Sequence, residues 1–277
     1  MPDSPPGDRS ATPALVIETQ ALSKSYDGHL AVDRVDLQVR AREIFGLIGP
    51  NGAGKSTLIK MLTTLLPPTS GEAQVAGCDI RRAPRAVRER IGYVPQLLSA
   101  DGALTGYENL LLSARLYLIP RAEREPRIRE ALHRTGLADA ADRLARQYSG
   151  GMVRRLEIAQ STLHRPPVLI MDEPTVGLDP VARHQVWQHV RDLRDRYGTT
   201  ILVTTHVMEE AEALCDRVGI LHQGRLEKVG TPAELCAEIG PDATLDDVFA
   251  RVAGADVETE GDFRGVRLAR RAEREHG

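Results

Sequence analysis

The feature that most constrains the fold is the segment Gly49 to Thr57, which reads GPNGAGKST. It fits the pattern GxxxxGK[ST] and lies between the apolar run 44–48 and a helical pattern at about 55–64. Backbone N–H groups in such a loop, together with the helix N-terminus, can face phosphate oxygens. Lys55 is placed to reach terminal phosphates, and the Ser56 hydroxyl to hold Mg²⁺. The predicted phosphate-binding residues are Gly49, Pro50, Asn51, Gly52, Ala53, Gly54, Lys55, Ser56 and Thr57.

Short apolar runs alternate with helical patterns along most of the chain, which is typical of a largely parallel α/β sheet. The expected strands lie at 15–17, 35–39, 44–48, 91–94, 168–171, 201–204, 218–221 and 225–229. Between 97 and 148 the strand patterns stop and helices take over, beginning with a capping box at Thr105 and Glu108. The sequence therefore predicts a helical insert of about fifty residues in an α/β frame.

A second motif follows the phosphate loop by more than a hundred residues. The apolar run Val168 to Met171 ends in Asp172, and Glu173 comes next. A carboxylate at the C-terminal edge of a buried strand lies where α/β proteins bind ligands. We expect Asp172 to act on Mg²⁺, directly or through water, and Glu173 to orient and deprotonate an attacking water. An Asp-Glu strand end is also a common structural feature, but its pairing with the phosphate loop favours the functional interpretation.

The charge balance is close to neutral, because 36 basic and 39 acidic side chains give a formal charge of −3. Domains whose main partner is nucleic acid usually carry a strong basic excess. The longest apolar candidate, 110–119, is interrupted by Ser113 and Arg115 and is shorter than the roughly 18 to 20 residues that cross a bilayer. We therefore expect no nucleic-acid partner and no membrane span.

The three cysteines, Cys78, Cys215 and Cys236, lie far apart and form no CxxC pair. This usage predicts reduced thiols in a cytoplasmic protein rather than a disulfide framework or a zinc site. Residues 1–13 contain Pro, Asp, Ser and Gly without an apolar stretch, and we expect a disordered lead there.

Four further motifs make the chain similar to a known family. Tyr148-Ser149-Gly150-Gly151-Met152 resembles the LSGGQ signature of ATP-binding cassette (ABC) proteins, and 177–180, which reads GLDP, resembles their D-loop. Gln96, after a predicted strand, resembles the Q-loop glutamine, and His206 the switch histidine. All six elements occur in the family's order, and the resemblance covers about residues 15–235.

The resemblance implies a P-loop NTPase fold of the α/β class, with a RecA-like core, an antiparallel β subdomain and the helical insert. The expected units are a lead at 1–13, an ATPase domain at 14–240 with the insert at 97–148, and a C-terminal helix and charged tail at 241–277. That last helix is expected from Thr244 onward, where apolar residues recur at helical spacing.

The resemblance also implies ATP and Mg²⁺ as cofactors. The implied catalytic residues are Glu173, His206, Gln96 and Lys55; the implied Mg²⁺ ligands are Ser56, Gln96 and Asp172; further nucleotide contacts come from Tyr26, Ser149, Gly150, Gly151 and Met152. Tyr26 lies 23 residues before Gly49, where the family places a ring on adenine, although it could equally be a half-buried strand-end residue. Met152 replaces the usual glutamine, so we expect the change to affect turnover rather than binding.

The family implies a head-to-tail pair of cassettes, either two copies or one with a related subunit, and a separate transmembrane permease. The expected location is cytoplasmic, peripheral on the inner face of the cell membrane. Residues 104–110 and 244–249 resemble segments of drug-resistance and other ABC-2-type exporters. Two alternatives remain at this point: a cassette of a translation factor or DNA-repair ATPase, and a P-loop kinase, which would not explain residues 148–152 or His206.

Overall fold

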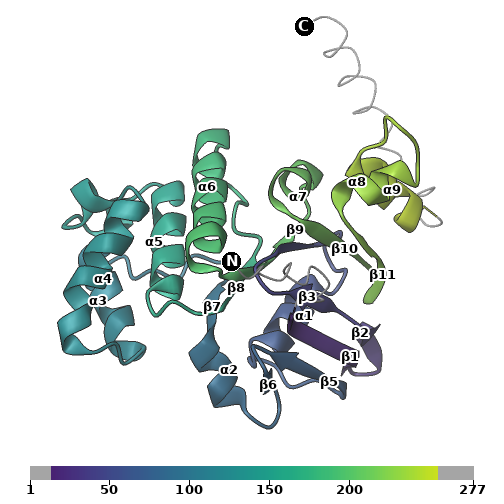
Figure 1. Cartoon of the computed structure of the whole chain (residues 1–277), viewed down its shortest axis with the longest axis horizontal. Coiled ribbons are helices and arrows are strands. Elements are labelled where there is room, and N and C mark those ends of the chain that lie inside the picture. Colours follow the sequence, from purple (N-terminus) through teal and green to yellow (C-terminus); the bar gives the residue numbers. More distant parts are fainter. Residues whose placement is uncertain (1–13, 255–277) are drawn as a thin grey trace, which may run out of the picture.

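The computed structural model describes residues 14–254, which form two sheets and a set of helices that lie around them (Figure 1). The strands are β1 (Leu15–Tyr26), β2 (His29–Val35), β3 (Gln38–Arg40), β4 (Ile44–Ile48), β5 (Ser70–Val75), β6 (Cys78–Asp79), β7 (Ile91–Val94), β8 (Val168–Asp172), β9 (Thr200–Thr205), β10 (Arg217–His222) and β11 (Arg225–Gly230). The helices are α1 (Lys55–Leu62), α2 (Pro84–Arg90), α3 (Gly106–Leu116), α4 (Arg121–Arg134), α5 (Gly150–Thr162), α6 (Pro180–Tyr197), α7 (Met208–Leu214), α8 (Pro232–Ala237) and α9 (Leu245–Ala253).

The central sheet has the strand order β11-β10-β4-β9-β8-β7, and every pair is parallel except β10 with β11. All residues of β4, β8 and β9 are buried, which explains why these strands read as continuous apolar runs. Ile48 pairs with Thr205, and Asp172 pairs with Thr204. The carboxyl ends of β4, β9 and β8 therefore lie side by side at one edge of the sheet.

The second sheet is antiparallel and has the order β2-β1-β5-β6, with β3 also paired to β1. The sequence pattern predicted one strand at 35–39, but the structure divides it between β2 and β3. The division has a local cause: the Asp36 carboxylate accepts a hydrogen bond from the Ala21 N–H (2.6 Å), and the Leu37 N–H donates to the Thr19 hydroxyl (2.8 Å). The N–H groups of Ala21 and Leu37 are therefore not available for the backbone hydrogen bonds that would continue a single strand through 35–39. The sequence pattern also gave no prediction of a strand at β5 or at β6.

The predicted helices of the insert are present, and α3, α4 and α5 pack around an apolar cluster of their own. Thr105 and Glu108 form the expected capping box of α3. Leu156 on α5 lies in the same cluster as Leu110 and Ile128 on α3 and α4. The helix that begins at Ser149 is thus packed with the insert, while the domain limits themselves stay a prediction.

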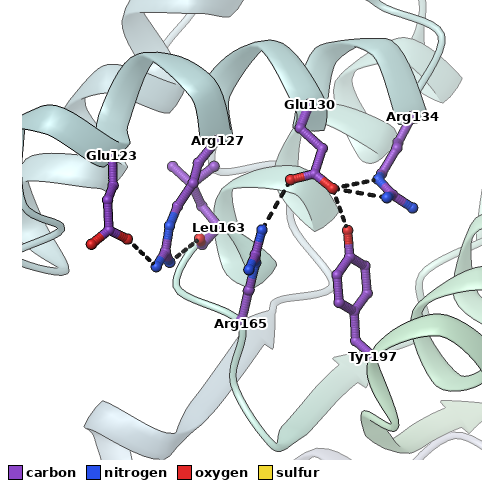
Figure 2. Close-up of polar contacts among 7 residues, drawn as sticks. All are labelled: Glu123, Arg127, Glu130, Arg134, Leu163, Arg165 and Tyr197. Carbon is purple, nitrogen blue, oxygen red and sulfur yellow. Dashed lines mark hydrogen bonds and ion pairs between the residues drawn. The ribbon is translucent and has the colours of Figure 1, made fainter.

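A polar cluster joins α4 to the central part of the molecule (Figure 2). The Glu130 carboxylate accepts hydrogen bonds from the Tyr197 hydroxyl at the end of α6 (2.8 Å) and from Arg165 in the loop before β8 (3.0 Å). Arg134 on the same helix also donates to Glu130 (2.8 Å). One carboxylate therefore ties the insert to two segments of the core.

The C-terminal helices pack at the far side of the central sheet from the insert (Figure 1). Leu245 and Val248 of α9 are buried, and Glu212 on α7 accepts the Leu245 N–H (2.7 Å). The expected disordered lead at 1–13 and most of the charged tail lie outside the described residues. Of the helices within 14–254, none combines the length and the apolar character that crossing a bilayer requires.

Candidate functional site

The loop between β4 and α1 contains two glycines that no other residue could replace without a backbone shift. Gly54 has φ +103°, and a Cβ there would lie 2.3 Å from the Ala31 carbonyl oxygen. A Cβ at Gly49 would lie 2.2 Å from the Leu221 carbonyl oxygen. No side chain caps the start of α1, whose first N–H groups have no acceptor within the helix. The loop therefore presents free backbone donors, which suits an anion.

Lys55 is held inside this loop rather than in solvent. Its side chain is only 5% exposed, and its Nζ donates to the carbonyl oxygens of Gly49 (2.7 Å) and Pro50 (3.0 Å). The same Nζ lies 3.4 Å from Oε1 of Glu173. The ammonium group thus joins the phosphate loop to the carboxylate that follows β8.

The Glu173 carboxylate contacts side chains that follow three different strands, β4, β7 and β9. Its Oε2 accepts a hydrogen bond from the Gln96 amide (3.3 Å), which follows β7, and lies 3.3 Å from Nδ1 of His206, which follows β9. Glu173 has φ +47° and is buried. The structure therefore brings together four residues that the sequence places far apart: Lys55, Gln96, Glu173 and His206.

Asp172 is the last residue of β8, and its Oδ1 accepts a hydrogen bond from the Thr204 hydroxyl (2.6 Å). That hydroxyl also accepts the Glu173 N–H (2.9 Å). Burial, with a smaller effect of the Asp172 charge, raises the pKa of nearby Tyr93 to about 12, so this phenol stays neutral. The sequence around Thr204 gives no sign of this role beyond a hydroxyl residue at the end of an apolar strand.

The donor set fits a magnesium ion bound together with phosphates. Ser56 lies in the first turn of α1, which follows β4, and Asp172 lies at the end of β8, the next strand but one in the sheet; both supply oxygen, which Mg²⁺ prefers. Among residues 14–254 there is no group of three His, Cys, Asp or Glu side chains that could bind a metal ion without a substrate. Mg²⁺ is usually held in proteins by one or two carboxylates plus phosphate oxygens and water.

The signature segment lies on a different part of the surface. Ser149 caps α5 by accepting the Met152 N–H (3.3 Å), and both Ser149 and Gly150 are exposed. A Cβ at Gly151 would lie 2.6 Å from the Ala182 Cβ on α6, so this glycine permits close helix packing. Within the described residues, no hydrogen bond or ion pair joins 149–152 to the loop 49–57. These predicted nucleotide contacts are therefore not assembled with the others in a single chain.

Tyr26 ends β1 with its ring 44% exposed, and the Lys24 ammonium lies 5.2 Å from the ring centroid. This partly exposed position at a strand end fits the alternative interpretation as well, so stacking on the base stays a prediction. An exposed aromatic face is available for stacking.

Comparisons with known proteins agree with this geometry. The sequence profile described as "ABC transporter" matches residues 32–176. The daunorubicin/doxorubicin resistance ATP-binding protein of Streptomyces peucetius is 48% identical over 228 residues, covering 82% of this chain and 69% of that protein. The Nod factor export ATP-binding protein I of Paraburkholderia xenovorans (strain LB400) is 43% identical over 231 residues, covering 83% and 76%.

A solved dimer of an ATP-binding cassette in a post-hydrolysis state, bound to ADP and Pi, has a TM-score of 0.71 at 27% identity and covers 78% of this chain and 98% of that one. The fold is that of the ABC ATPases, as the sequence predicted. The chain belongs to the ABC transporter family, in which it is an ATP-binding subunit and an ATPase.

Proposed function

We propose that this chain hydrolyses ATP with Mg²⁺ to drive export through a separate membrane permease, working as one half of a head-to-tail pair of cassettes. The observation that carries the proposal is the convergence of Lys55, Gln96 and His206 on Glu173 beside the phosphate loop. Phosphoryl transfer needs positioning and electrostatic stabilisation more than covalent chemistry, and this cluster supplies both.

Each residue has a distinct role in the proposed reaction. The backbone of 49–57 and the Lys55 ammonium hold the β and γ phosphates, and Ser56 and Asp172 would hold Mg²⁺. When bound, the ion neutralises charge on the phosphate oxygens. Glu173 orients the attacking water and accepts its proton, because its carboxylate lies among the side chains that face the terminal phosphate.

Gln96 and His206 both contact Oε2 of Glu173, and either side chain can turn toward the water or the γ-phosphate when nucleotide enters. Gln96 would also contact Mg²⁺ in that state. Tyr26 offers its exposed ring to the base.

The exposed position of Ser149 and Gly150 supports the dimer. Their hydroxyl and helix N-terminus are open to solvent, and within residues 14–254 no hydrogen bond joins them to the phosphate loop of their own chain, so they are available to a γ-phosphate held by another subunit. Two copies, or this chain with a related subunit, would therefore enclose two nucleotides.

The printed names of the relatives support a role in export. A group of exposed apolar side chains supports a membrane partner. Leu97, Leu116 and Leu118, which are 83%, 72% and 78% exposed, lie on the segment after Gln96 and at the end of α3. We propose this apolar surface as the permease-docking region, so that the chain lies at the cytoplasmic face of the membrane. A drug or other hydrophobic compound is the proposed cargo; among the relatives, the printed names are of daunorubicin/doxorubicin resistance and Nod factor export.

The proposed function is tested by a substitution at Glu173, the proposed general base. Glu173→Gln should retain ATP binding and accumulate an ATP-dependent dimer, while kcat falls by about a hundredfold or more, because the water loses its proton acceptor. Binding of a fluorescent ATP analogue, light scattering and phosphate release measure the three quantities. The matched control is Ser149→Arg in the same background, which should bind nucleotide but remain monomeric. Near-normal hydrolysis by Glu173→Gln would contradict the assignment of the base.

A further inference from the structure

Two charged residues of α5 are buried where a helix of this kind would normally carry apolar side chains. Arg154 and Glu157 are each 2% exposed, lie one turn apart, and form an ion pair with 3.0 Å between Nη1 and Oε2. Burying a charged pair is costly unless further hydrogen bonds satisfy both groups. We therefore expect both side chains to make further hydrogen bonds with defined polar groups nearby.

Both partners bind the backbone of the connection between β7 and α3. Arg154 donates from Nη1 to the Pro95 carbonyl oxygen (2.7 Å) and from Nη2 to the Gln96 carbonyl oxygen (2.8 Å). The forked guanidinium group suits two neighbouring acceptors.

Glu157 binds the other end of the same connection. Its Oε1 accepts the N–H of Ser99, the Ser99 hydroxyl (3.2 Å) and the N–H of Ala100 (3.2 Å). The ion pair thus holds residues 95–100 at both ends, and we call this contact the α5 clamp: Arg154, Glu157 and the backbone of 95–100.

The clamped segment carries a residue of the site. The side chain of Gln96 reaches Glu173, and Leu97 and Leu98 lie exposed between the two anchored ends. The N-cap residue of α5 is the signature residue Ser149, five residues before Arg154. A rigid helix therefore connects the two motifs directly.

We propose that Arg154 and Glu157 are positioning residues that fix Gln96 against Glu173 and make the segment 95–100 move together with the signature end of α5. The inference rests on the proposed function of Gln96 and Ser149. Its physical basis is that residues 95–100 form neither helix nor strand, so their placement depends on these side-chain contacts. A misplacement of about 1 Å at a catalytic group can cost a hundredfold in rate.

The test uses a variant that removes the clamp without leaving a lone buried charge. The double variant Arg154→Met with Glu157→Met replaces both charged groups by neutral side chains of similar length, neither of which can make these hydrogen bonds. The matched control is Arg155→Met, because Arg155 is the next residue on the helix and donates instead to Gln185 on α6 (2.7 Å). All proteins are the full chain.

Two readouts separate positioning from a general loss of stability. The first is the ATPase reaction, for which the double variant should lower kcat by about tenfold while KM for ATP stays within about twofold. The second is the mobility of a nitroxide on Leu97→Cys in a Cys236→Ser background, since Cys78 and Cys215 are buried. Its electron paramagnetic resonance spectrum should sharpen in the double variant and not in Arg155→Met.

The possible outcomes are distinct. An unchanged kcat and an unchanged spectrum in the double variant would overturn the proposal, as would a lower melting temperature with an unchanged spectrum, because the role would then be structural. If the wild-type chain failed to hydrolyse ATP, the proposed function would fail instead. In that case the spectrum alone would still decide whether the clamp holds residues 95–100.

Discussion

At the scale of single residues, Thr204 contacts two groups of the site with one hydroxyl. It donates to Oδ1 of Asp172 and accepts the N–H of Glu173, and it is fully buried in β9. The positive φ of Glu173 is one that a non-glycine residue adopts at a cost, so a fixed N–H partner helps to maintain it. Thr204 therefore orients both acidic residues although it touches no substrate.

We predict that Thr204→Val, which keeps the side-chain shape, lowers kcat by about 10 to 100-fold and weakens the dependence of activity on Mg²⁺, since partners of metal ligands typically contribute that much. A titration of ATPase activity with Mg²⁺ measures both effects. Thr200→Val is the control, because Thr200 lies at the opposite end of the same strand and, among residues 14–254, its hydroxyl accepts only the Arg42 N–H. Equal activities of the two variants would show that Thr204 has no orienting role.

At the scale of elements, the attachment of α4 to the core depends on Glu130. The Tyr197 hydroxyl makes the largest contribution to holding the pKa of Glu130 below its ordinary value, with Arg134 and Arg165 adding to it against the effect of burial. A carboxyl whose pKa is lowered by folding contributes stability above its ordinary pKa and loses it as the pH falls through the lowered value. The link is thus intact at neutral pH.

We predict that Glu130→Gln lowers the free energy of unfolding at pH 7 by about 1 kcal/mol, a small value because Glu130 and Arg165 are partly exposed. Denaturant titration followed by circular dichroism measures the change. Glu123→Gln is the control: Figure 2 shows that Glu123 pairs with Arg127 of its own helix and does not reach the core. Since an exposed pair within one helix contributes at most about 0.5 kcal/mol, a larger effect in Glu123→Gln than in Glu130→Gln would contradict the proposed link.

At the scale of the whole molecule, two histidines, the partly buried His164 and the buried His189, lie where the helical insert meets the core. The His164 ring stacks on Tyr117 with 3.7 Å between ring centroids, and its Nε2 lies 3.1 Å from the Ile91 carbonyl oxygen. His189 on α6 is buried beside Arg134, and its Nε2 has no hydrogen-bond partner among the described residues. Burial lowers the pKa of both rings to about 4, so both are neutral at pH 7.

The sign of the pH effect follows from these values. The unfolded chain binds protons to both rings below an ordinary pKa of 6.5, while the folded chain resists protonation down to about 4. Stability is therefore complete above pH 6.5 and falls between pH 6.5 and 4, by about 1.4 kcal/mol per pH unit for each histidine. Thermal unfolding at a series of pH values checks this window, and His189→Leu should reduce the slope by about half. A slope that His189→Leu leaves unchanged would mean that other groups cause the acid sensitivity.

The sequence alone determined the family, the order of the motifs and the type of nearly every element in the central sheet. This was possible because the phosphate loop works through its own backbone: Gly49, Gly54 and Lys55 lie within seven consecutive residues, and Lys55 donates to the Gly49 carbonyl oxygen of the same loop. The buried strands were equally readable, because burial on both faces leaves a continuous apolar run. The sequence pattern did not predict the division of 35–39 into two strands, because that division depends on a hydrogen bond between Asp36 and the N–H of Ala21 in β1.

Only the tertiary structure decided which distant residues act together. Arg154 bonds to a carbonyl 59 residues earlier in the chain, and Thr204 to a carboxylate 32 residues earlier, and neither partner alters the local sequence pattern around the other. The separation of Ser149 from the phosphate loop is likewise a property of the folded chain. The chemical groups of each motif come from residues that are close together in the sequence. The orientation of those groups depends on contacts between distant residues, which form only when α5 and the central sheet pack.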